Sequence, residues 1–304
     1  MDAPSLSSQP TMASRTPIRI GAFCLTVRDL DRCVAFYREA VGLDLMDRQP
    51  GSAVLGIDDV RLLYLEHAPD ALADDKGEAG MFHAAFAMPT RRDLADWHAH
   101  AQRAGVTITR TGDHLVNEAI YYDDPEGNGC ECYADRPPET WTWYPDGTRK
   151  ILTGTPIDVA DLMAEAGPAT DAWEPPSGLR VGHINLRVSD VRKAEWFWCE
   201  AVGLDHVGRR DVNLGGRPNA ITFMSSGGYH HHVAANNFTT SPGAGPRNPK
   251  RAGLAWFTVE AESGEVLEGI RQRLAKAGVE TRALPGGGFE ARDPWGTHVH
   301  FVRA

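Results

Sequence analysis

The sequence predicts an α+β protein built from four copies of one βαβββ unit. Residues 27–44 (VRDLDRCVAFYREAVGLD) return later in the chain as residues 188–205 (VSDVRKAEWFWCEAVGLD). The segment DPEGNGCE at residues 124–131 has a degenerate counterpart, DPWGTHVH, at residues 293–300. Repeats of this kind indicate a duplicated fold, so we expect the units to resemble one another and a functional cleft to lie where units meet.

Each unit opens with a short apolar strand, passes through an amphipathic helix and then adds further strands. In the first unit, the strand IGAFCLTV precedes Asp29, a residue type that often caps a helix N-terminus. The helix DRCVAFYREAV then ends at Gly42, because glycine accepts the left-handed conformation that follows many helices. The four predicted units span about residues 18–67, 81–135, 179–236 and 253–302.

Two units per domain predict two domains, which a chain of 304 residues is long enough to form. The segment between them is rich in Pro, Trp and Asp, and we interpret it as an irregular connector with one short helix near residues 159–166. The predicted organisation is a disordered tail at residues 1–15, an N-terminal domain at residues 16–136, a connector at residues 137–178 and a C-terminal domain at residues 179–304.

The composition is typical of a globular protein in an aqueous compartment, with 42% hydrophobic and 24% charged residues. A net charge of −10 argues against a nucleic-acid partner, which would require a basic surface. There is no apolar run of membrane-spanning length, and the first residues lack the apolar region of a signal peptide. The five cysteines show no disulfide-framework spacing. We therefore expect a cytoplasmic protein with reduced thiols.

Three longer strings carry a family resemblance: GDHLVNEAIYYDDPEGNGCECYADRP at residues 112–137, GHINLRVSD at residues 182–190 and GYHHHVAANN at residues 228–237. Together with the four ordered units, they resemble the vicinal oxygen chelate superfamily of glyoxalases, bleomycin-resistance proteins and extradiol dioxygenases. Within it, they are most similar to the catechol 2,3-dioxygenase group. The resemblance extends from about residue 16 to the end. It implies two vicinal-oxygen-chelate (glyoxalase-like) domains whose sheets curl around a cleft that binds a divalent metal.

The resemblance also implies where the metal ligands stand. Non-haem Fe(II) oxygenases use two histidines and one carboxylate, which leave positions open for substrate and O₂. In this superfamily the ligands lie on the first strands of two units and on the last strand of one of them. Those positions hold His83 and Glu131 in the second unit and His183 in the third. The implied metal is Fe(II), with Mn(II) as a possible substitute.

A rival set of ligands lies wholly in the C-terminal half. It consists of His183, one histidine of residues 230–232, and His300, and three imidazoles would suit zinc, copper or nickel better than iron. The first and fourth units offer only Ala22 and Leu254 at the position of the first ligand. Whether His298 and His300 form a second site is left open.

Ring cleavage also needs a proton acceptor near the metal, and a histidine suits this role. We expect the histidine run to lie on the last strand of the third unit. The separation of His232 from His183 resembles that between the first ligand and the acid–base histidine of extradiol dioxygenases, which implies His232 as the acid–base residue and His230 as the second choice. By the resemblance, Tyr121 would bind a substrate oxygen and His114 would donate to that oxygen or to O₂. Further candidates at the substrate are Tyr229, Asn236 at the end of the histidine strand, and Glu118 behind a ligand.

These expectations favour a metal-dependent extradiol dioxygenase that cleaves a catechol-type aromatic substrate with O₂. A homo-oligomer without nucleic-acid or membrane partners is expected. Two alternatives stay open. One is a glyoxalase-like isomerase or lyase with Zn, Ni or Mn, which an additional carboxylate ligand would favour. The other is a non-catalytic protein that binds aromatic ligands, as bleomycin-resistance proteins do.

Overall fold

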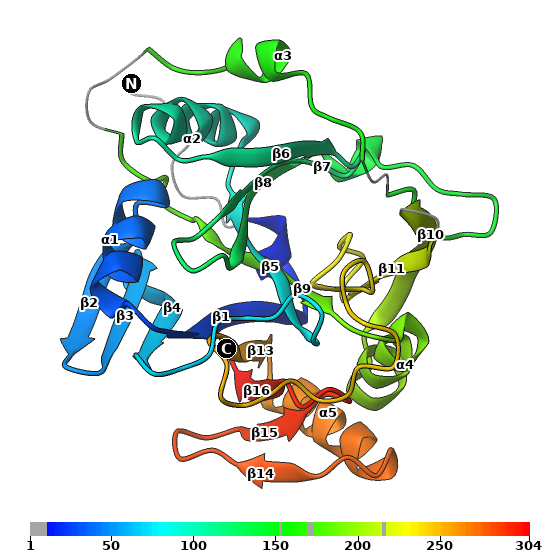
Figure 1. Cartoon of the computed structure of the whole chain (residues 1–304). Helices are drawn as coiled ribbons and strands as arrows, with labels where there is room; N and C mark the ends of the chain where they lie inside the picture. Colours follow the sequence, from blue (N-terminus) through cyan, green and yellow to red (C-terminus); the bar gives the residue numbers. More distant parts are fainter. Residues whose placement is uncertain (1–10, 152–153, 169–172, 215–216) are drawn as a thin grey trace.

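A computed structural model describes residues 11–151, 154–168, 173–214 and 217–304 of the chain. It confirms the predicted α+β class, with two curled, mixed β-sheets of eight strands each and helices packed against them (Figure 1). The predicted disordered residues 1–10 lie outside the described part. Residues 11–15 correct the prediction of a loose tail, because Met12–Arg15 forms the 3₁₀ helix η1 and buries Ala13.

The four units have the predicted element order. The first contains β1 (Ile18–Val27), α1 (Leu30–Ala40), β2 (Asp44–Gln49), β3 (Ser52–Ile57) and β4 (Val60–His67). The second contains β5 (Gly80–Met88), α2 (Arg91–Arg103), β6 (Ile108–Asp113), β7 (Asn117–Asp123) and β8 (Gly129–Asp135).

The third unit contains β9 (Arg180–Arg187), α4 (Val191–Glu195), the π-helical turn η3 (Trp196–Val202), β10 (Asp205–Leu214), β11 (Arg217–Ser225) and β12 (Val233–Asn236). The fourth contains β13 (Gly253–Ala261), α5 (Gly264–Lys276), β14 (Thr281–Ala283), β15 (Phe289–Arg292) and β16 (His298–Arg303). The connector carries η2 (Pro138–Thr140) and the short helix α3 (Val159–Met163), close to where the sequence predicts one.

The predicted helix signals act as expected in the first unit. The Asp29 side chain accepts a hydrogen bond from the backbone N–H of Arg32 at 3.0 Å, which satisfies one of the free donors at the start of α1. Gly42 adopts a φ of 80°, the left-handed conformation expected after the helix. Local sequence therefore determines where α1 begins and ends.

The sheets do not follow the predicted domain boundary. One sheet has the strand order β14-β15-β16-β13-β1-β4-β3-β2 and joins the first unit to the fourth. The other has the order β10-β11-β12-β9-β5-β8-β7-β6 and joins the second unit to the third. In each sheet the first strands of two units pair antiparallel, β1 with β13 and β5 with β9. Each predicted domain thus contributes half of both sheets.

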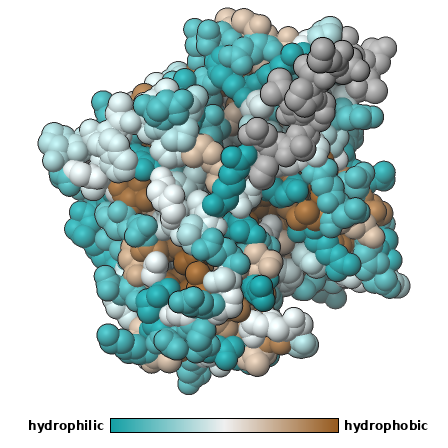
Figure 2. Space-filling view, turned by 180° about the vertical axis from the view of Figure 1, so that it is seen from behind, coloured by the Kyte–Doolittle hydropathy of each residue, from teal (hydrophilic) through white to brown (hydrophobic). Residues whose placement is uncertain are grey.

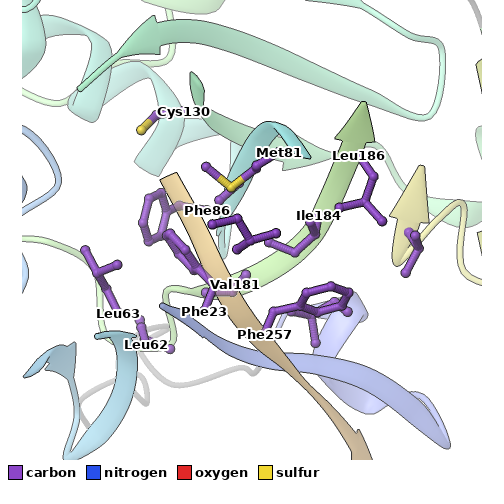
Figure 3. Close-up of a cluster of buried hydrophobic side chains, with 14 of the residues drawn as sticks. Phe23, Leu62, Leu63, Met81, Phe86, Cys130, Val181, Ile184, Leu186 and Phe257 are labelled. Carbon is purple, nitrogen blue, oxygen red and sulfur yellow. The ribbon is translucent and has the colours of Figure 1, made fainter. Parts of the chain in front are cut away.

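The core lies where the central strands of the two sheets pack face to face (Figure 3). Phe23 of β1 and Phe257 of β13 are fully buried, as are Phe86 of β5 and Ile184 of β9 from the other sheet. The rings of Phe23 and Phe86 lie 6.0 Å apart, so they link the sheets directly. Side chains alternate along a strand, so the opposite faces of β5 and β9 are directed away from this core.

None of the helices in the described ranges is long and apolar enough to cross a membrane. On the face seen in Figure 2, hydrophilic side chains cover much of the surface and hydrophobic residues gather in separate patches. All five cysteines are free thiols in the structure.

Candidate metal centre

The alternation of side chains along the central strands separates core residues from site residues. On β5, Ala84 and Phe86 belong to the core, so His83, which precedes Ala84 and alternates with it, is turned to the cleft face. On β8, Cys130 and Cys132 face the core, and Glu131 between them faces the cleft. Side chains alternate in the same way on β9, where Ile184 faces the core and the preceding histidine faces the cleft.

That third side chain is His183, and it meets the other two across the strand pairs. In the register of the sheet, Ala85 pairs with Glu131 on one side and with His183 on the other. The Nε2 atoms of His83 and His183 lie 3.3 Å apart. The Oε2 atom of Glu131 is 2.9 Å from the first and 3.4 Å from the second. The three ligand atoms lie within 4.8 Å of one another, close enough to share one ion.

The chemistry of this set fits a divalent cation. Glu131 is 1% exposed, and neither of its oxygens has a hydrogen-bond partner of good geometry among the described residues, despite the short distances to the imidazoles. A buried carboxylate without donors is costly unless a cation neutralises it. Burial lowers the pKa of His83 to about 4 despite the nearby Glu131 charge. Burial opposes the ionisation of Glu131, yet the two histidines hold its pKa well below the usual value. Neutral imidazole and ionised carboxylate are the forms that bind metal.

A cavity opens in front of the three side chains. Tyr121 of β7 lines it, and the hydroxyl of Tyr121 lies 2.7 Å from Nε2 of His114. Gly112 makes room for this pair, because a Cβ there would lie 2.6 Å from the same nitrogen. Burial, and next the charge of Glu131, raise the pKa of Tyr121 well above its usual value, so the phenol keeps its proton. The cavity walls are Phe82, His83, Arg110, His114, Tyr121, Glu131, Ile151, His183, Asn185, Ile221, Phe223, His231 and Phe238.

The histidine run is placed differently from the sequence prediction. Strand β12 begins at Val233, so the prediction that the histidines stand on this strand is wrong, and strand parity does not set their directions. His231 lines the cavity, with its ring centroid 4.1 Å from that of His183. His232 lies outside the cavity walls and hydrogen-bonds to Ser225 and to the carbonyl of Ala13. The 3₁₀ helix η1, which the sequence does not reveal as structured, provides this alternative partner through Ala13.

His230, the second predicted acid–base residue, also lies behind the cavity wall. Its Nε2 donates to the carboxylate of Asp135 at 2.6 Å, and its Nδ1 lies 2.7 Å from Nδ1 of His231. Tyr229 is turned to the same carboxylate, to which its hydroxyl donates at 3.2 Å, and it also bonds the hydroxyl of Tyr133. His230 therefore contacts His231 from behind, and neither His230 nor Tyr229 lines the cavity.

Two more predicted substrate residues have structural partners. Glu118 forms a salt bridge with Arg91 and another with Arg136 at 3.1 Å, away from the cavity walls. Asn236 donates from its amide to the side-chain oxygen of Asn185 at 2.9 Å. Asn185 itself lines the cavity, and sequence reasoning missed it. The signal was available, since Asn185 stands two residues after His183 on the same strand face.

The corresponding positions of the first sheet hold no such ligand set among the described residues. His300 pairs with Thr258 in the same way as Glu131 pairs with Ala85. The residue two positions before Thr258 is therefore the counterpart of His83. It is Trp256, and this corrects the prediction that Leu254 occupies the position of the first ligand. His300 stacks on Trp256 and contacts Glu290, which also contacts His298. In the rival ligand set, His300 would have to join His183, but the two stand in different sheets. Within the described residues, the single group that could hold a metal is the one in the second sheet.

Comparison with known proteins agrees with this architecture. The family model "Glyoxalase/Bleomycin resistance protein/Dioxygenase superfamily" matches residues 19–132 and 180–301. The chain belongs to this superfamily. The match covers all four units, as the repeat in the sequence predicts.

Among curated members of the superfamily, the chain is 35% identical over 286 residues to catechol-2,3-dioxygenase of Bacillus subtilis, covering 93% of this chain and 96% of that protein. It is 28% identical over 185 residues to biphenyl-2,3-diol 1,2-dioxygenase 3 of Rhodococcus globerulus, covering 55% of this chain and 94% of that protein. Among solved structures, glyoxalase I of Zea mays has a TM-score of 0.57 at 18% identity, over 96% of this chain and 94% of that one. The last match bears on the fold alone.

Proposed function

We propose that the protein is an extradiol dioxygenase that opens a catechol-type aromatic ring with O₂ and a divalent metal. The observation that carries the proposal is the buried set of His83, His183 and Glu131 at the base of a cavity. Dioxygenase names among the relatives support the reaction class. We propose Fe(II) as the native metal, with Mn(II) as a possible substitute, because two histidines and one carboxylate are typical of non-haem iron oxygenases.

The three side chains would hold the metal and leave coordination positions open. When bound, Fe(II) would supply a site that binds both catechol oxygens together with O₂. The aromatic and aliphatic walls would hold the ring, because Phe82, Phe223 and Phe238 line the cavity beside Ile221. Such walls exclude water and favour a flat apolar substrate.

We assign the acid–base role to His231 in place of His232. Burial, and next the neighbouring His183, lower the pKa of His231 well below its usual value, so the ring is neutral at neutral pH. Because Nε2 of His230 donates to Asp135, the Nδ1 of His230 is left to accept the Nδ1 hydrogen of His231. Nε2 of His231 is then free to accept a proton from a bound catechol and to return it later.

Three further groups would orient the substrate. The oxygen of Asn185 is committed to Asn236, so its amide N–H₂ remains for a ligand in the cavity. Tyr121 retains its phenolic proton and can donate to a substrate oxygen. His114 bonds to that hydroxyl and fixes its direction. Hydrogen bonds from fixed donors in a buried site stabilise developing charge on oxygen.

The geometry weighs against the isomerase alternative. In the third unit, Ala234 pairs with Asn185 and so occupies the position that Glu131 holds in the second unit. An alanine supplies no fourth ligand, and a three-ligand site keeps more positions open for substrate and O₂. A non-catalytic role is disfavoured for a different reason: a buried acid–base histidine beside a complete ligand set is not needed merely to bind a ring.

The proposal is tested by loading anaerobically purified protein with Fe(II) and supplying catechol and O₂. We expect oxygen uptake equal to the catechol consumed, with a ring-opened product in which both oxygen atoms of ¹⁸O₂ are incorporated. His83→Ala should lose the metal and the activity, whereas His67→Ala, a substitution at an exposed histidine, should keep both. Stoichiometric metal without any catechol turnover would exclude the proposed reaction.

A further inference from the structure

We propose that the natural substrate carries an anionic substituent, such as a carboxylate on a short side chain, and that Arg110 binds it beside the metal cavity. This inference rests on the proposed function and adds the substrate class. It starts from a second pocket of ≈ 250 Å³ that adjoins the metal cavity. The two spaces share four lining residues: Phe82, His83, Arg110 and Tyr121. A ring bound at the metal could therefore extend a substituent past these residues into the second pocket.

Arg110 stands at the junction of the two spaces. Its guanidinium carbon lies 3.7 Å from the centroid of the Tyr121 ring and 5.9 Å from that of Phe82. These ring contacts hold the exposed side chain beside both spaces. Among the described residues, no hydrogen bond or carboxylate contact of this guanidinium is seen, so its N–H groups remain for a ligand. A planar fork of donors is well suited to a carboxylate, which it can bind through two parallel hydrogen bonds.

Two further cationic side chains line the second pocket. Lys76 and Arg187 line it, and both pair with the same carboxylate, that of Asp74, at 3.1 and 2.8 Å. Arg187 is 1% exposed, and its Nε and Nη1 atoms have no hydrogen-bond partner within the described ranges. The opposing charge in the lining is Asp123, which is exposed to solvent, as are Lys76 and Arg110.

The charge balance of the second pocket therefore favours an anion. Three cationic side chains line it, whereas Asp123 and the shared Asp74 supply two carboxylates. This local excess stands out in a chain with a net charge of −10. The field of a positive pocket attracts an anionic ligand, and it repels a cationic one.

The test compares two ligands that differ only in charge, 3,4-dihydroxyphenylacetate and its primary amide. Their affinities for the metal-loaded protein are measured by calorimetry without O₂, so that binding is observed apart from turnover. We expect the wild-type protein to bind the acid about tenfold more tightly than the amide, as one added ion pair of about 1.4 kcal/mol would produce. Arg110→Gln should bring the ratio of the two affinities close to one.

Two further variants distinguish the effect of the paired N–H donors of Arg110 from the effect of its charge. Arg110→Lys should give an intermediate ratio, because lysine retains the charge but not the paired donors. Arg103→Gln, at an exposed position on α2 away from both pockets, should keep the wild-type ratio. Equal affinity of the wild type for acid and amide would overturn the inference and leave the proposed function standing. Equal weakening of both ligands in Arg110→Gln would also overturn it, since the guanidinium would then serve the catechol oxygens. If neither ligand binds, both proposals fail.

Discussion

The Nε2 atoms of His83 and His183 lie 3.3 Å apart, although the two residues stand in different repeat units on opposite sides of the connector. Their strands, β5 and β9, pair antiparallel, with His83 opposite Asn185 and His183 opposite Ala85. The metal centre therefore depends on the pairing of two units that the sequence assigns to different domains. The predictions below follow from this arrangement.

Glu131→Gln should remove most of the metal. The amide is nearly isosteric with the carboxylate but carries no charge, and a buried divalent ion with two neutral imidazoles would lack its single anionic ligand. We expect metal content, measured by elemental analysis after anaerobic loading and desalting, to fall at least tenfold. Glu290→Gln, at the carboxylate beside His300 in the other sheet, is the matched control and should keep the wild-type content. Equal metal loss in both variants would contradict the assignment.

His231→Phe should lower kcat by about 10²-fold, the usual contribution of a positioned acid–base residue. The ring shape is retained, so the metal content and the fold should be preserved. The measurement is steady-state oxygen uptake on a catechol substrate, together with metal analysis of the same sample. The reverse pattern, full activity in His231→Phe and a comparable loss in a folded His232→Gln protein, would restore the original sequence-based choice of His232.

His232→Gln should make stability less sensitive to acid. Burial lowers the pKa of His232 to about 3 in the folded protein, against a usual value of 6.5. Protonation therefore favours the unfolded chain, so the stability is fully present above pH 6.5 and is lost progressively as the pH falls toward 3. Removing the titrating group should flatten this dependence by on the order of 2 kcal/mol between pH 6.5 and 4.5.

The measurement for His232→Gln is urea unfolding at several pH values in this range. Part of the acid sensitivity should remain, because burial also lowers the pKa of His230. His67→Gln, a substitution of an exposed histidine, serves as the control and should leave the wild-type pH profile. An unchanged slope in His232→Gln would show that the imidazole is not held neutral in the folded protein.

Phe86→Ala should destabilise the whole molecule and not only one sheet. Phe86 is fully buried and its ring lies 6.0 Å from that of Phe23 in the other sheet. Truncation of such a residue costs about 3–5 kcal/mol, through lost burial and the cavity left behind. The free energy of unfolding from urea titration tests this, with Leu72→Ala at a position 49% exposed as the control. A loss below about 1 kcal/mol in Phe86→Ala would mean that the two sheets are not tightly packed there.

Homo-oligomerisation stays a prediction of the family resemblance. Sedimentation velocity over a tenfold range of protein concentration would test it, since a stable dimer sediments faster than a 33.2 kDa monomer at every concentration. If the protein sediments as a monomer at every concentration, the prediction of a homo-oligomer is wrong. This result would not affect the proposed metal centre.

The sequence by itself determined the features that local chemistry decides. The repeat predicted four βαβββ units, and Asp29 and Gly42 marked the ends of a helix because capping and left-handed turns depend on a few adjacent residues. Because side chains alternate between the two faces of a strand, Glu131 was expected on the face opposite to that of Cys130 and Cys132, which lie in the core. The resemblance to a known family then indicated which three residues would share a metal.

Tertiary structure decided what depends on contacts between distant segments. The repeat alone does not specify which units pair, but the ligand set implied by the family resemblance requires the second unit to pair with the third, and the pairing of β5 with β9 confirms this. Only the fold decided the register, which places His83 opposite Asn185 and His183 opposite Ala85. The choice between His231 and His232 was also tertiary. The histidines precede β12, so strict alternation of side chains between two faces does not set their directions, and the carbonyl of Ala13 in η1 accepts a hydrogen bond from His232. His231 is thereby the histidine of the run that lines the cavity.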